Sequence, residues 1–451
     1  MINFAFRRLL FSGASLVLLA MLLVPVPTKA QYCTSRGCCP GRDDECTARY
    51  YDTLCYCDVF CNMTAMDCCP DFWYYCMGAP RPTLPPTEGP KYDYCIFKGV
   101  IYNPGTSIKR NCNTCVCRLS YDGDAEFVCE DNPCLVDPIT IDDVNDDYYL
   151  GWRASNYSFL WGLTQSEGVL YRLGTFPPGR AVSQMVEVII NPEGALPERF
   201  DSRENWPGLI GEVVDQGNCG SSWAISTASV ASDRLAIQSL GELNPRLSEQ
   251  HLLSCNFRGQ RGCSGGYLDR AWYYLRKSGL LSRACYPYHS GVAEDTVMRK
   301  LQCRVPYDSN RCPASGVTSD LYISTPPYRI AAREAEIMTE IYRNGPVQAT
   351  FNVKNDFFVY NRGVYRHVKQ DFTASQTDTG QAGWHSVKIV GWGVDRSIPN
   401  NPIKYWLCTN SWGRNWGEQG MFRIIRGVNE CEIESFVLGV WMQVGHNHMS
   451  G

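Results

Sequence analysis

One helix is predicted by the spacing of apolar residues in the second half of the chain. Downstream of Ser222, small and apolar residues recur at intervals of four, three and four positions, and Gly241 ends the run. The recurring residues are Ala224, Ala228, Ala231 and Leu235. This periodicity predicts a helix of roughly 18 residues with Ser222 at its N-terminus, where the helix dipole favours negative charge.

Two apolar runs further along predict buried strands, and each carries one polar residue of a catalytic type. His385 lies within the run 383–393, and Asn410 lies within the run 405–413. The chain has only 6 histidines, so candidates for a general base are few. A nucleophile needs a base within hydrogen-bond reach and a third group that orients the base. Ser222, His385 and Asn410 therefore form a candidate catalytic constellation.

The residues around Ser222 form a motif, because segment 216–223 reads Gln-Gly-Asn-Cys-Gly-Ser-Ser-Trp. It resembles the active-site segment of papain-like cysteine proteases, Gln-Gly-x-Cys-Gly-x-Cys-Trp, in which the second cysteine is the nucleophile. Ser222 stands at that position, and His385 and Asn410 follow in the family's order. The resemblance implies that Gln216 helps to form an oxyanion hole. It also implies an α+β fold class, a papain-like two-lobed domain with a helical lobe and a β-barrel-like lobe, preceded by small disulfide-rich modules.

Residues 196 to about 442 resemble cathepsin B in particular, including the start Leu-Pro-Glu-Arg-Phe-Asp-Ser-Arg. The resemblance implies a disulfide between Cys219 and Cys263. It also implies a substrate-groove wall at Gly265 and Gly266, for which an ordinary turn is the alternative. Six further cysteines of this domain allow 15 pairings and are left open; they are Cys255, Cys285, Cys303, Cys312, Cys408 and Cys431.

Two positions besides Ser222 depart from cathepsin B. The region that corresponds to its occluding loop, 285–312, contains only His289 in place of adjacent histidines, so removal of dipeptides from a C-terminus is not expected. The position of a glutamate on the floor of the cathepsin B S2 pocket corresponds to Phe436. Such a pocket would accept apolar groups or be filled.

The N-terminal 30 residues read as a secretory signal peptide. Arg7 and Arg8 precede an apolar core from Leu9 to Val24, and a small-residue cleavage site follows at 28–30. A retained membrane anchor is the alternative, but the core is short for a membrane span. The 24 cysteines, an even number in dense clusters, predict disulfides and an oxidising compartment. We therefore expect a secreted protein without a membrane span.

Two small cysteine-rich modules and a linker are predicted next. Residues 31–77 hold ten cysteines and resemble a somatomedin-B domain, which usually has eight, so the pairing stays open. A zinc cluster is the alternative; without histidine, a secreted cluster of this kind favours disulfides, and no metal or cofactor is expected. Residues 78–91 are a proline-rich linker. Residues 92–135 carry six cysteines and resemble a short von Willebrand C-type module, with an unnamed disulfide knot as the alternative.

Residues 136–195 contain no cysteine and are similar to the propeptide of cathepsin B, which lies across the cleft. They begin acidic and continue with Trp152, Phe159 and Trp161. So many aromatic residues favour a docked segment over a solvated linker. Residues 196–451 then form the papain-like, cathepsin-B-like domain. Asn62 and Asn156 begin glycosylation motifs, Asn-Met-Thr and Asn-Tyr-Ser.

The order of these parts is similar to that of the tubulointerstitial nephritis antigen family, including its antigen-like members. The resemblance implies a secreted basement-membrane glycoprotein with laminin, collagen IV and integrins as partner classes. The chain has no Arg-Gly-Asp motif, so integrin contact needs another surface. Its net charge of -4 gives no argument for nucleic acid.

Three functions follow from the sequence. The first is a non-catalytic protein of the extracellular matrix that mediates cell–matrix adhesion, with a degenerate site at Gln216, Ser222, His385 and Asn410. The second is a weak serine-type peptidase that uses Ser222. The third is a decoy that binds peptides or proteases through an intact groove.

Overall fold

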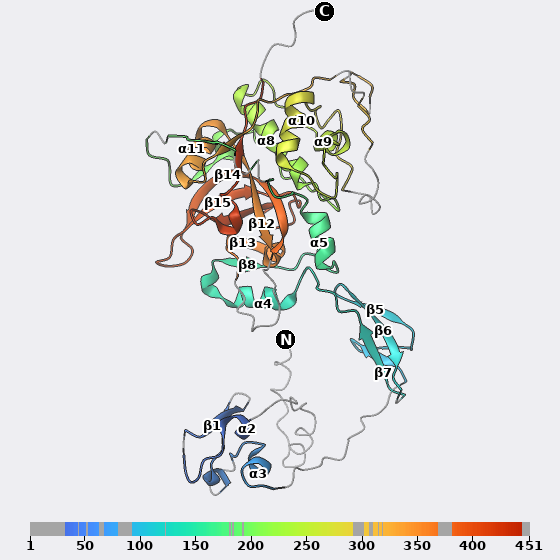
Figure 1. Ribbon diagram of the computed structural model, residues 1–451, viewed down its shortest axis with the longest axis vertical. Helices are drawn as coiled ribbons and strands as arrows, with labels where there is room; N and C mark the ends of the chain where they lie inside the picture. The colour runs from blue at the N-terminus through green and yellow to red at the C-terminus, as the bar shows by residue number, and fades with distance from the viewer. Residues whose placement is uncertain are drawn as a thin grey trace, which may run out of the picture. The chain divides into compact units, whose positions relative to one another are not determined.

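The computed structural model describes most of the chain beyond the predicted signal peptide. The described residues are 32–43, 45–50, 53–62, 67–79, 93–121, 123–179, 182, 185–191, 194–291, 302–305, 310–313, 315–317, 319–368 and 381–443. The predicted signal peptide and most of the predicted linker lie outside them. The chain forms two compact units, residues 1–91 and 92–451 (Figure 1).

The first unit is a small knot built around its cysteines. Its elements are α2 (Cys33–Arg36), β1 (Thr47–Tyr50), β2 (Thr53–Tyr56), η1 (Val59–Asn62) and α3 (Phe72–Tyr75), with β1 and β2 in an antiparallel hairpin. Five disulfides close it: Cys33–Cys57, Cys38–Cys76, Cys39–Cys46, Cys55–Cys69 and Cys61–Cys68. Phe72 is buried among these cysteines. So short a segment cannot bury a large core, and cross-links supply the stability instead.

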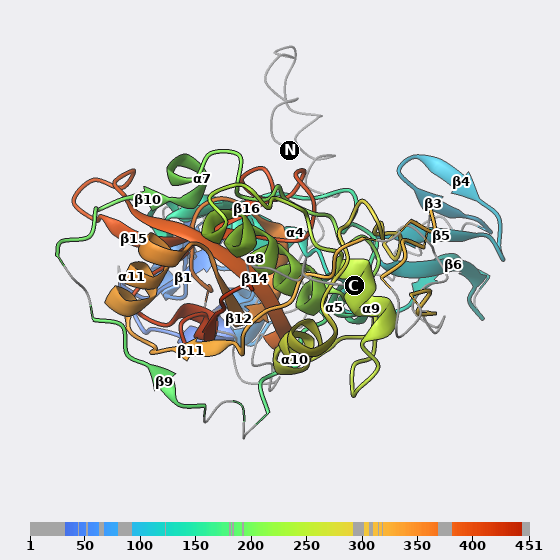
Figure 2. The ribbon, with the colours of Figure 1, turned by 90° about the horizontal axis from the view of Figure 1, so that it is seen from above.

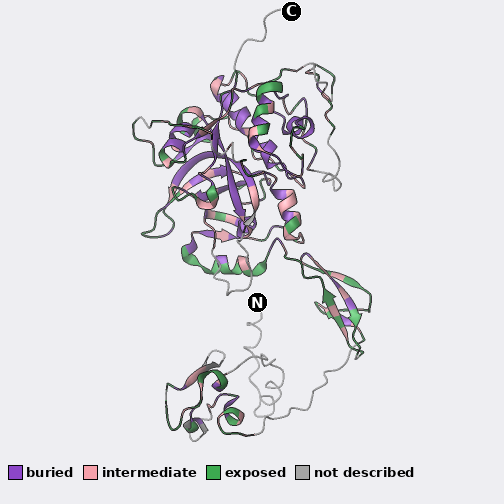
Figure 3. Ribbon diagram, viewed as in Figure 1, coloured by how far each residue is buried: buried purple, intermediate pink, exposed green. Residues whose placement is uncertain are grey.

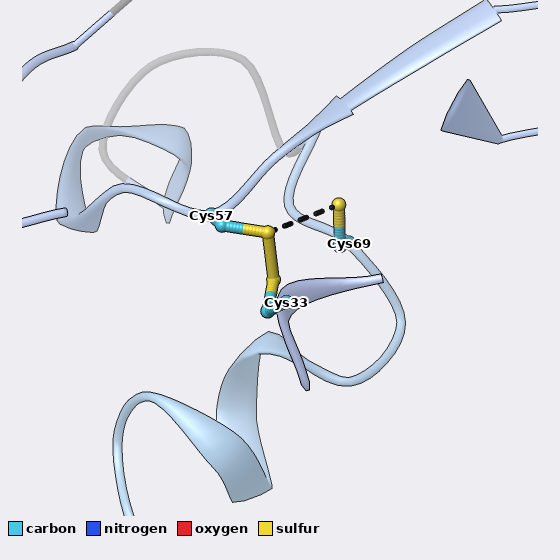
Figure 4. A group of neighbouring side chains, drawn as sticks. All are labelled: Cys33, Cys57 and Cys69. Carbon is cyan, nitrogen blue, oxygen red and sulfur yellow. Dashed lines mark hydrogen bonds between the residues drawn. A yellow bond between two sulfur atoms is a disulfide. The ribbon is translucent and has the colours of Figure 1, made fainter. Parts of the chain in front are cut away.

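Two disulfides of this knot pack against each other. Cys57 and Cys69 Sγ atoms lie 3.5 Å apart, and Cys57 is bonded to Cys33 (Figure 4). Cys69 is bonded to Cys55. Metal binding requires thiolates, and these sulfurs are oxidised. The group is therefore a packed disulfide core.

The second unit begins with a five-stranded cysteine-rich module. Its strands are β3 (Cys95–Phe97), β4 (Val100–Tyr102), β5 (Ser107–Arg110), β6 (Asn113–Leu119) and β7 (Ala125–Cys129). The strands β3 and β4 form one hairpin, and β5, β6 and β7 form a three-stranded sheet. Three disulfides join them: Cys95–Cys117, Cys112–Cys134 and Cys115–Cys129.

The larger part of this unit contains a ten-stranded sheet. Nine strands run in the order β8-β13-β16-β15-β14-β12-β17-β11-β9, and β10 pairs with β14. Their bounds are β8 (Trp152–Ala154), β9 (Glu187–Val188), β10 (Phe200–Asp201), β11 (Tyr328–Ile330), β12 (Val347–Lys354), β13 (Tyr360–Tyr365), β14 (Gln381–Asp395), β15 (Ile403–Thr409), β16 (Met421–Ile425) and β17 (Val437–Gly439). The core beneath them is rich in aromatic residues, including Phe351, Phe357 and Trp416.

Helices pack on this sheet. They are α7 (Ser202–Asn205), α8 (Ser222–Gln238), α9 (Glu249–Cys255), α10 (Leu268–Ser278) and α11 (Glu334–Asn344), with short turns η3 (Asn355–Val359) and η4 (Glu430–Glu432). Three of them, α8, α9 and α10, form a second lobe against the sheet, whereas α7 and α11 pack on the sheet itself. Helix α8 lies between β14 on one side and α9 and α10 on the other (Figures 1 and 2). It is buried along nearly its whole length (Figure 3). The predicted helix is confirmed: it begins at Ser222 and ends three residues before Gly241.

The segment before the two lobes is docked on them, as its aromatic content predicted. It contains α4 (Pro138–Asp146), η2 (Tyr148–Leu150), β8 and α5 (Gln165–Arg172). Strand β8 pairs antiparallel with β13. Trp152 is buried and donates from Nε1 to the Arg366 carbonyl at 3.0 Å. Tyr157 donates from its hydroxyl to the Tyr360 carbonyl at 2.7 Å, which ties the segment to the sheet.

The cysteines of the two lobes are not all paired. Disulfides join Cys219 to Cys263, Cys255 to Cys303 and Cys285 to Cys312. Cys408 and Cys431 are free thiols. The count of 15 pairings assumed that six cysteines were all bonded, and that assumption is wrong. Cys408 lies buried inside β15, where the sheet surrounds it with apolar side chains. Within the described part of the chain, no helix is both long and apolar enough to cross a membrane.

Candidate functional site

Ser222 is the first residue of α8 and is completely buried. The loop before it is held by the Cys219–Cys263 disulfide and by a 2.8 Å hydrogen bond from the Gly220 amide to the Cys263 carbonyl. The Ser222 side chain therefore stands at a fixed point where the two lobes meet. The free amides of the helix N-terminus favour negative charge there.

His385 and Asn410 are brought together by the pairing of β14 with β15. His385 donates from Nε2 to Asn410 Oδ1 at 2.8 Å. The His385 ring lies against Phe351 and Trp412, at centroid distances of 5.9 and 5.3 Å. Complete burial lowers the pKa of His385 to about 4, although the hydrogen bond that His385 donates to Asn410 acts in the opposite direction. The imidazole is thus neutral at pH 7, with the Nδ1 lone pair available as a base.

The Ser222 hydroxyl is bonded to the docked segment and not to His385. Ser222 Oγ lies 2.8 Å from Thr175 Oγ1, and Thr175 Oγ1 lies 2.8 Å from Ser386 Oγ. Ser386 Oγ continues to Ser226 Oγ at 2.8 Å. Among the described residues, His385 Nδ1 has no hydrogen-bond partner. The Ser222 hydroxyl is therefore part of a chain of buried hydroxyls and is not bonded to the His385 ring, as a nucleophile would be to its base.

Two donors next to Ser222 point at a carbonyl of the same segment. The Leu173 carbonyl accepts from Gln216 Nε2 at 3.2 Å and from the Ser222 amide at 3.4 Å. Ser411 fixes the Gln216 amide by donating from Oγ to Oε1 at 2.6 Å. A side-chain amide and a backbone N–H that converge in this way can stabilise an oxyanion. Here the chain's own Leu173 carbonyl occupies the position.

The glycine pair predicted as a groove wall contacts the residues that follow Leu173. The Gly266 amide donates to the Gly174 carbonyl, and the Phe176 amide donates to the Gly266 carbonyl, both at 2.9 Å. At Gly265, an added Cβ would lie 2.6 Å from the Phe176 ring. These glycines thus let a peptide backbone lie close against them, which an ordinary turn would not explain.

Gly174 is required at its position for two reasons. Its φ is +108°, in the region that favours glycine, and an added Cβ would lie 2.0 Å from the Gly220 carbonyl oxygen. The segment therefore passes the loop before Ser222 at backbone contact distance.

Arg172 anchors the segment on the other side. It is only 4% exposed and donates from Nη1 to the Gly217 carbonyl at 2.8 Å. It also donates from Nη2 to Asn218 Oδ1 at 3.2 Å. Its own carbonyl accepts from Trp412 Nε1 at 2.6 Å. Residues 172–176 are thus held by both lobes at once.

The remaining predicted positions lie away from these contacts. Phe436 is buried in the helical lobe's core, so the position is filled by its own ring. Asn156 is exposed in a loop, whereas the side chain of Asn62 lies outside the described residues. His289 is exposed, and much of the loop that follows it lies outside the described residues. Among the described residues, the groups close enough to share a metal ion contain cysteines that are in disulfides.

Sequence reasoning identified Gln216, Ser222, His385 and Asn410 but missed the residues that cover them. Leu173 and Thr175 contact Ser222, and Ser386 is bonded to Thr175. The sequence marks 173–175 only as propeptide-like. Thr175 follows a glycine and belongs to no periodic or charged pattern, so nothing in the sequence indicates that its hydroxyl contacts Ser222.

Comparison with known proteins agrees with this architecture. The family model for papain family cysteine protease matches residues 196–441. The tubulointerstitial nephritis antigen-like protein of Rattus norvegicus is 46% identical over 432 residues, which cover 93% of this chain and 90% of the relative. The tubulointerstitial nephritis antigen of Homo sapiens is 42% identical, with 92% and 88% covered.

A solved structure with both the segment and the two lobes is also similar. The procathepsin B S9 of Trypanosoma congolense superposes with a TM-score of 0.59 at 31% identity, covering 69% of this chain and 99% of that one. A procathepsin L2 of Tenebrio molitor has a TM-score of 0.53 at 25% identity, covering 67% and 89%. The chain belongs to the papain family and, within it, to the tubulointerstitial nephritis antigen group.

Proposed function

We propose that this protein is a secreted, non-catalytic, cathepsin-B-like glycoprotein of the extracellular matrix that mediates adhesion of cells to basement membrane. In this proposal Ser222 replaces the cysteine nucleophile of the papain family. The observation that carries the proposal is the contact of Ser222 Oγ with Thr175, while His385 Nδ1 is left without a partner.

The chemistry of the site supports the absence of peptidase activity. A thiol of pKa near 8.5 is ionised readily by a helix N-terminus and a neighbouring imidazolium, whereas a serine hydroxyl is far less acidic. A serine nucleophile depends on general-base catalysis and on a buried carboxylate that stabilises the imidazolium. Asn410 is neutral, and burial keeps His385 neutral as well. The site lacks the charge that would activate Ser222.

The docked segment supports the same proposal and opposes the decoy hypothesis. Its Leu173 carbonyl and Thr175 hydroxyl use the groups that a bound peptide would use. In a papain-like zymogen such a segment is removed by proteolysis, often by another papain-like protease or by the enzyme itself. Without a thiol, self-cleavage between residues 136 and 196 is not expected, so the segment stays in the cleft of the secreted protein.

Matrix binding is assigned to the small modules and the protein surface. The proposed partner classes are laminin, collagen IV and cell-surface integrins. The proposed glycosylation sites are Asn62 and Asn156. The exposed position of Asn156 is compatible with such a glycan. Disulfide-rich modules such as 31–77 and 92–135 carry no catalytic constellation, which favours binding as their role.

The test is retention of the secreted protein on basement-membrane extract. We expect the full chain to be retained and deletion of residues 31–135 to weaken retention strongly. Ser222→Ala is the matched control and should be retained like the wild type, because binding does not use the cleft. Equal retention of residues 196–451 alone would contradict the role of the modules.

A further inference from the structure

The outer side of α10 and the loop before it carry an excess of positive charge. Residues 257–283 contain six basic residues and one acidic residue, although the whole chain has a net charge of -4. Five of the six basic side chains are exposed and define the α10 basic face; they are Arg258, Arg261, Arg270, Arg276 and Lys277.

The geometry of α10 places three of these cations on its solvent side. The helix buries Leu268, Ala271, Trp272 and Leu275 against the helical lobe. Arg270, Tyr273 and Lys277 follow one another at three and four residues, which keeps them on the opposite side, with Arg276 beside them. Arg270 and Lys277 are about 10 Å apart along the axis. The helix lies at the edge of the lobe, so this side is open (Figure 2).

The preceding loop extends the row of cations beyond the helix N-terminus. Arg270 donates from Nη1 to the Gly259 carbonyl at 2.8 Å, which fixes the loop of Arg258 and Arg261 beside α10. The Arg270 guanidinium lies 4.4 Å from the Tyr267 ring centroid, and that of Arg261 lies 5.5 Å from the Phe176 ring centroid. Stacking on rings orients guanidinium groups without neutralising them.

Among the residues that the structure describes, no carboxylate forms an ion pair with this face. The sixth basic residue, Arg283, is instead paired with Glu249 at 3.1 Å. The one acidic residue in the region is Asp269. Tyr273 is 49% exposed between the cations, so the face also offers an aromatic surface.

We propose that the α10 basic face binds a linear sulfated polysaccharide. Guanidinium groups bind tetrahedral oxyanions through paired N–H donors, and a narrow row of cations fits a linear chain with repeated sulfate groups. This inference deepens the proposed matrix function and rests on it for the extracellular setting. Outside the cell, the strongly anionic membrane leaflet, which is the cytoplasmic one, is not accessible.

The test measures binding of the full-length secreted protein to immobilised heparin across a range of salt concentrations. Arg276→Gln/Lys277→Gln removes two cations of the face, and Arg343→Gln/Arg362→Gln removes two exposed cations elsewhere in the two lobes as a matched control. We expect wild type and control to be retained at physiological salt. The Arg276/Lys277 variant should elute at lower salt, with its slope of log K against log salt reduced by about one for each cation lost.

Three results would overturn the proposal: wild type that is not retained at physiological salt, an equal loss in both double variants, or equal binding to phosphatidylserine vesicles and to heparin. Arg258→Gln is a further variant in a loop, where no helix is disturbed, and should also lower the eluting salt. Failure on heparin with normal retention on basement-membrane extract would reject this inference alone and leave the proposed function standing.

Discussion

The cleft at Ser222 and the α10 basic face make opposite use of polar groups. In the cleft, Ser222 and Gln216 are paired with the chain's own residues 173–175 and are buried. On α10, cations such as Arg276 and Lys277 are exposed and lack ion pairs within the described residues. Buried polar groups must be paired to be stable, whereas exposed charges gain from a partner outside the chain. On the proposed function, binding therefore uses the outer surface of the protein and not the groove of the papain fold.

The largest effect is expected from a substitution that displaces residues 172–176 from the cleft. Gly174→Ala places a Cβ against the Gly220 carbonyl at a positive φ, so the segment cannot keep its path. We expect a loss of roughly 3 to 5 kcal/mol in the free energy of unfolding, measured with denaturant, and rapid proteolysis near residue 174. Gly179→Ala is the control, since an added Cβ there meets nothing within 4 Å. Equal stability of the two variants would show that the segment is not held as described.

Acid should weaken the closed cleft next most strongly. The pKa of His385 is lowered to about 4 by burial, against about 6.5 in the unfolded chain. Between pH 6.5 and 4 the unfolded chain therefore binds a proton that the folded chain does not. The free energy of unfolding falls as the pH falls through this range, and the contribution of His385 is fully present above pH 6.5. A buried histidine with this pKa should lower the free energy of unfolding by roughly 2 kcal/mol at pH 5 relative to pH 7.

A pair of variants separates this effect from general acid denaturation. His251 is the matched control, since burial also lowers its pKa to about 4, at a site on α9 away from Ser222. We expect His385→Gln and His251→Gln each to remove a similar part of the acid dependence in urea unfolding between pH 7 and pH 5. Because Thr175 is bonded to Trp384 and Ser386 on either side of His385, we expect protonation of His385 to expose the segment to protease at pH 5. Only His385→Gln should remove this acid-induced proteolysis. The same proteolysis in both variants would contradict the link to the cleft.

The hydroxyl contact itself should have the smallest effect. Thr175→Val keeps the shape of the side chain but leaves Ser222 and Ser386 without their shared partner. We expect a loss of roughly 1 kcal/mol in unfolding free energy, because Ser386 keeps its hydrogen bond with Ser226. Thr175→Ser retains the hydroxyl and should lose clearly less. If valine and serine destabilise equally, packing and not hydrogen bonding holds Thr175.

The sequence predicted the framework of the site and a docked segment over it, but not the contacts that close the site. Helical spacing after Ser222 and apolar runs around His385 and Asn410 are local patterns. They led to the correct helix and to strands β14 and β15, although β15 ends at Thr409, one residue before Asn410. Thr175, the partner of the Ser222 hydroxyl, lies 47 residues away, and Ser386, which is bonded to Thr175, lies 211 residues from Thr175; contacts of this kind leave no periodic signal. The free thiol of Cys408 was also hidden, because its burial inside β15 depends on strand neighbours and not on cysteine spacing.

The most direct test of the account is hydrolysis of arginine- and phenylalanine-bearing fluorogenic peptides by the purified full chain. A closed cleft with a serine, a neutral His385 and a neutral Asn410 predicts no turnover above that of Ser222→Ala. The assay should be repeated with Gly174→Ala, which opens the cleft without touching Ser222, and the prediction is again no turnover. Turnover by the wild type that Ser222→Ala abolishes would show that Ser222 is a working nucleophile and would contradict the account.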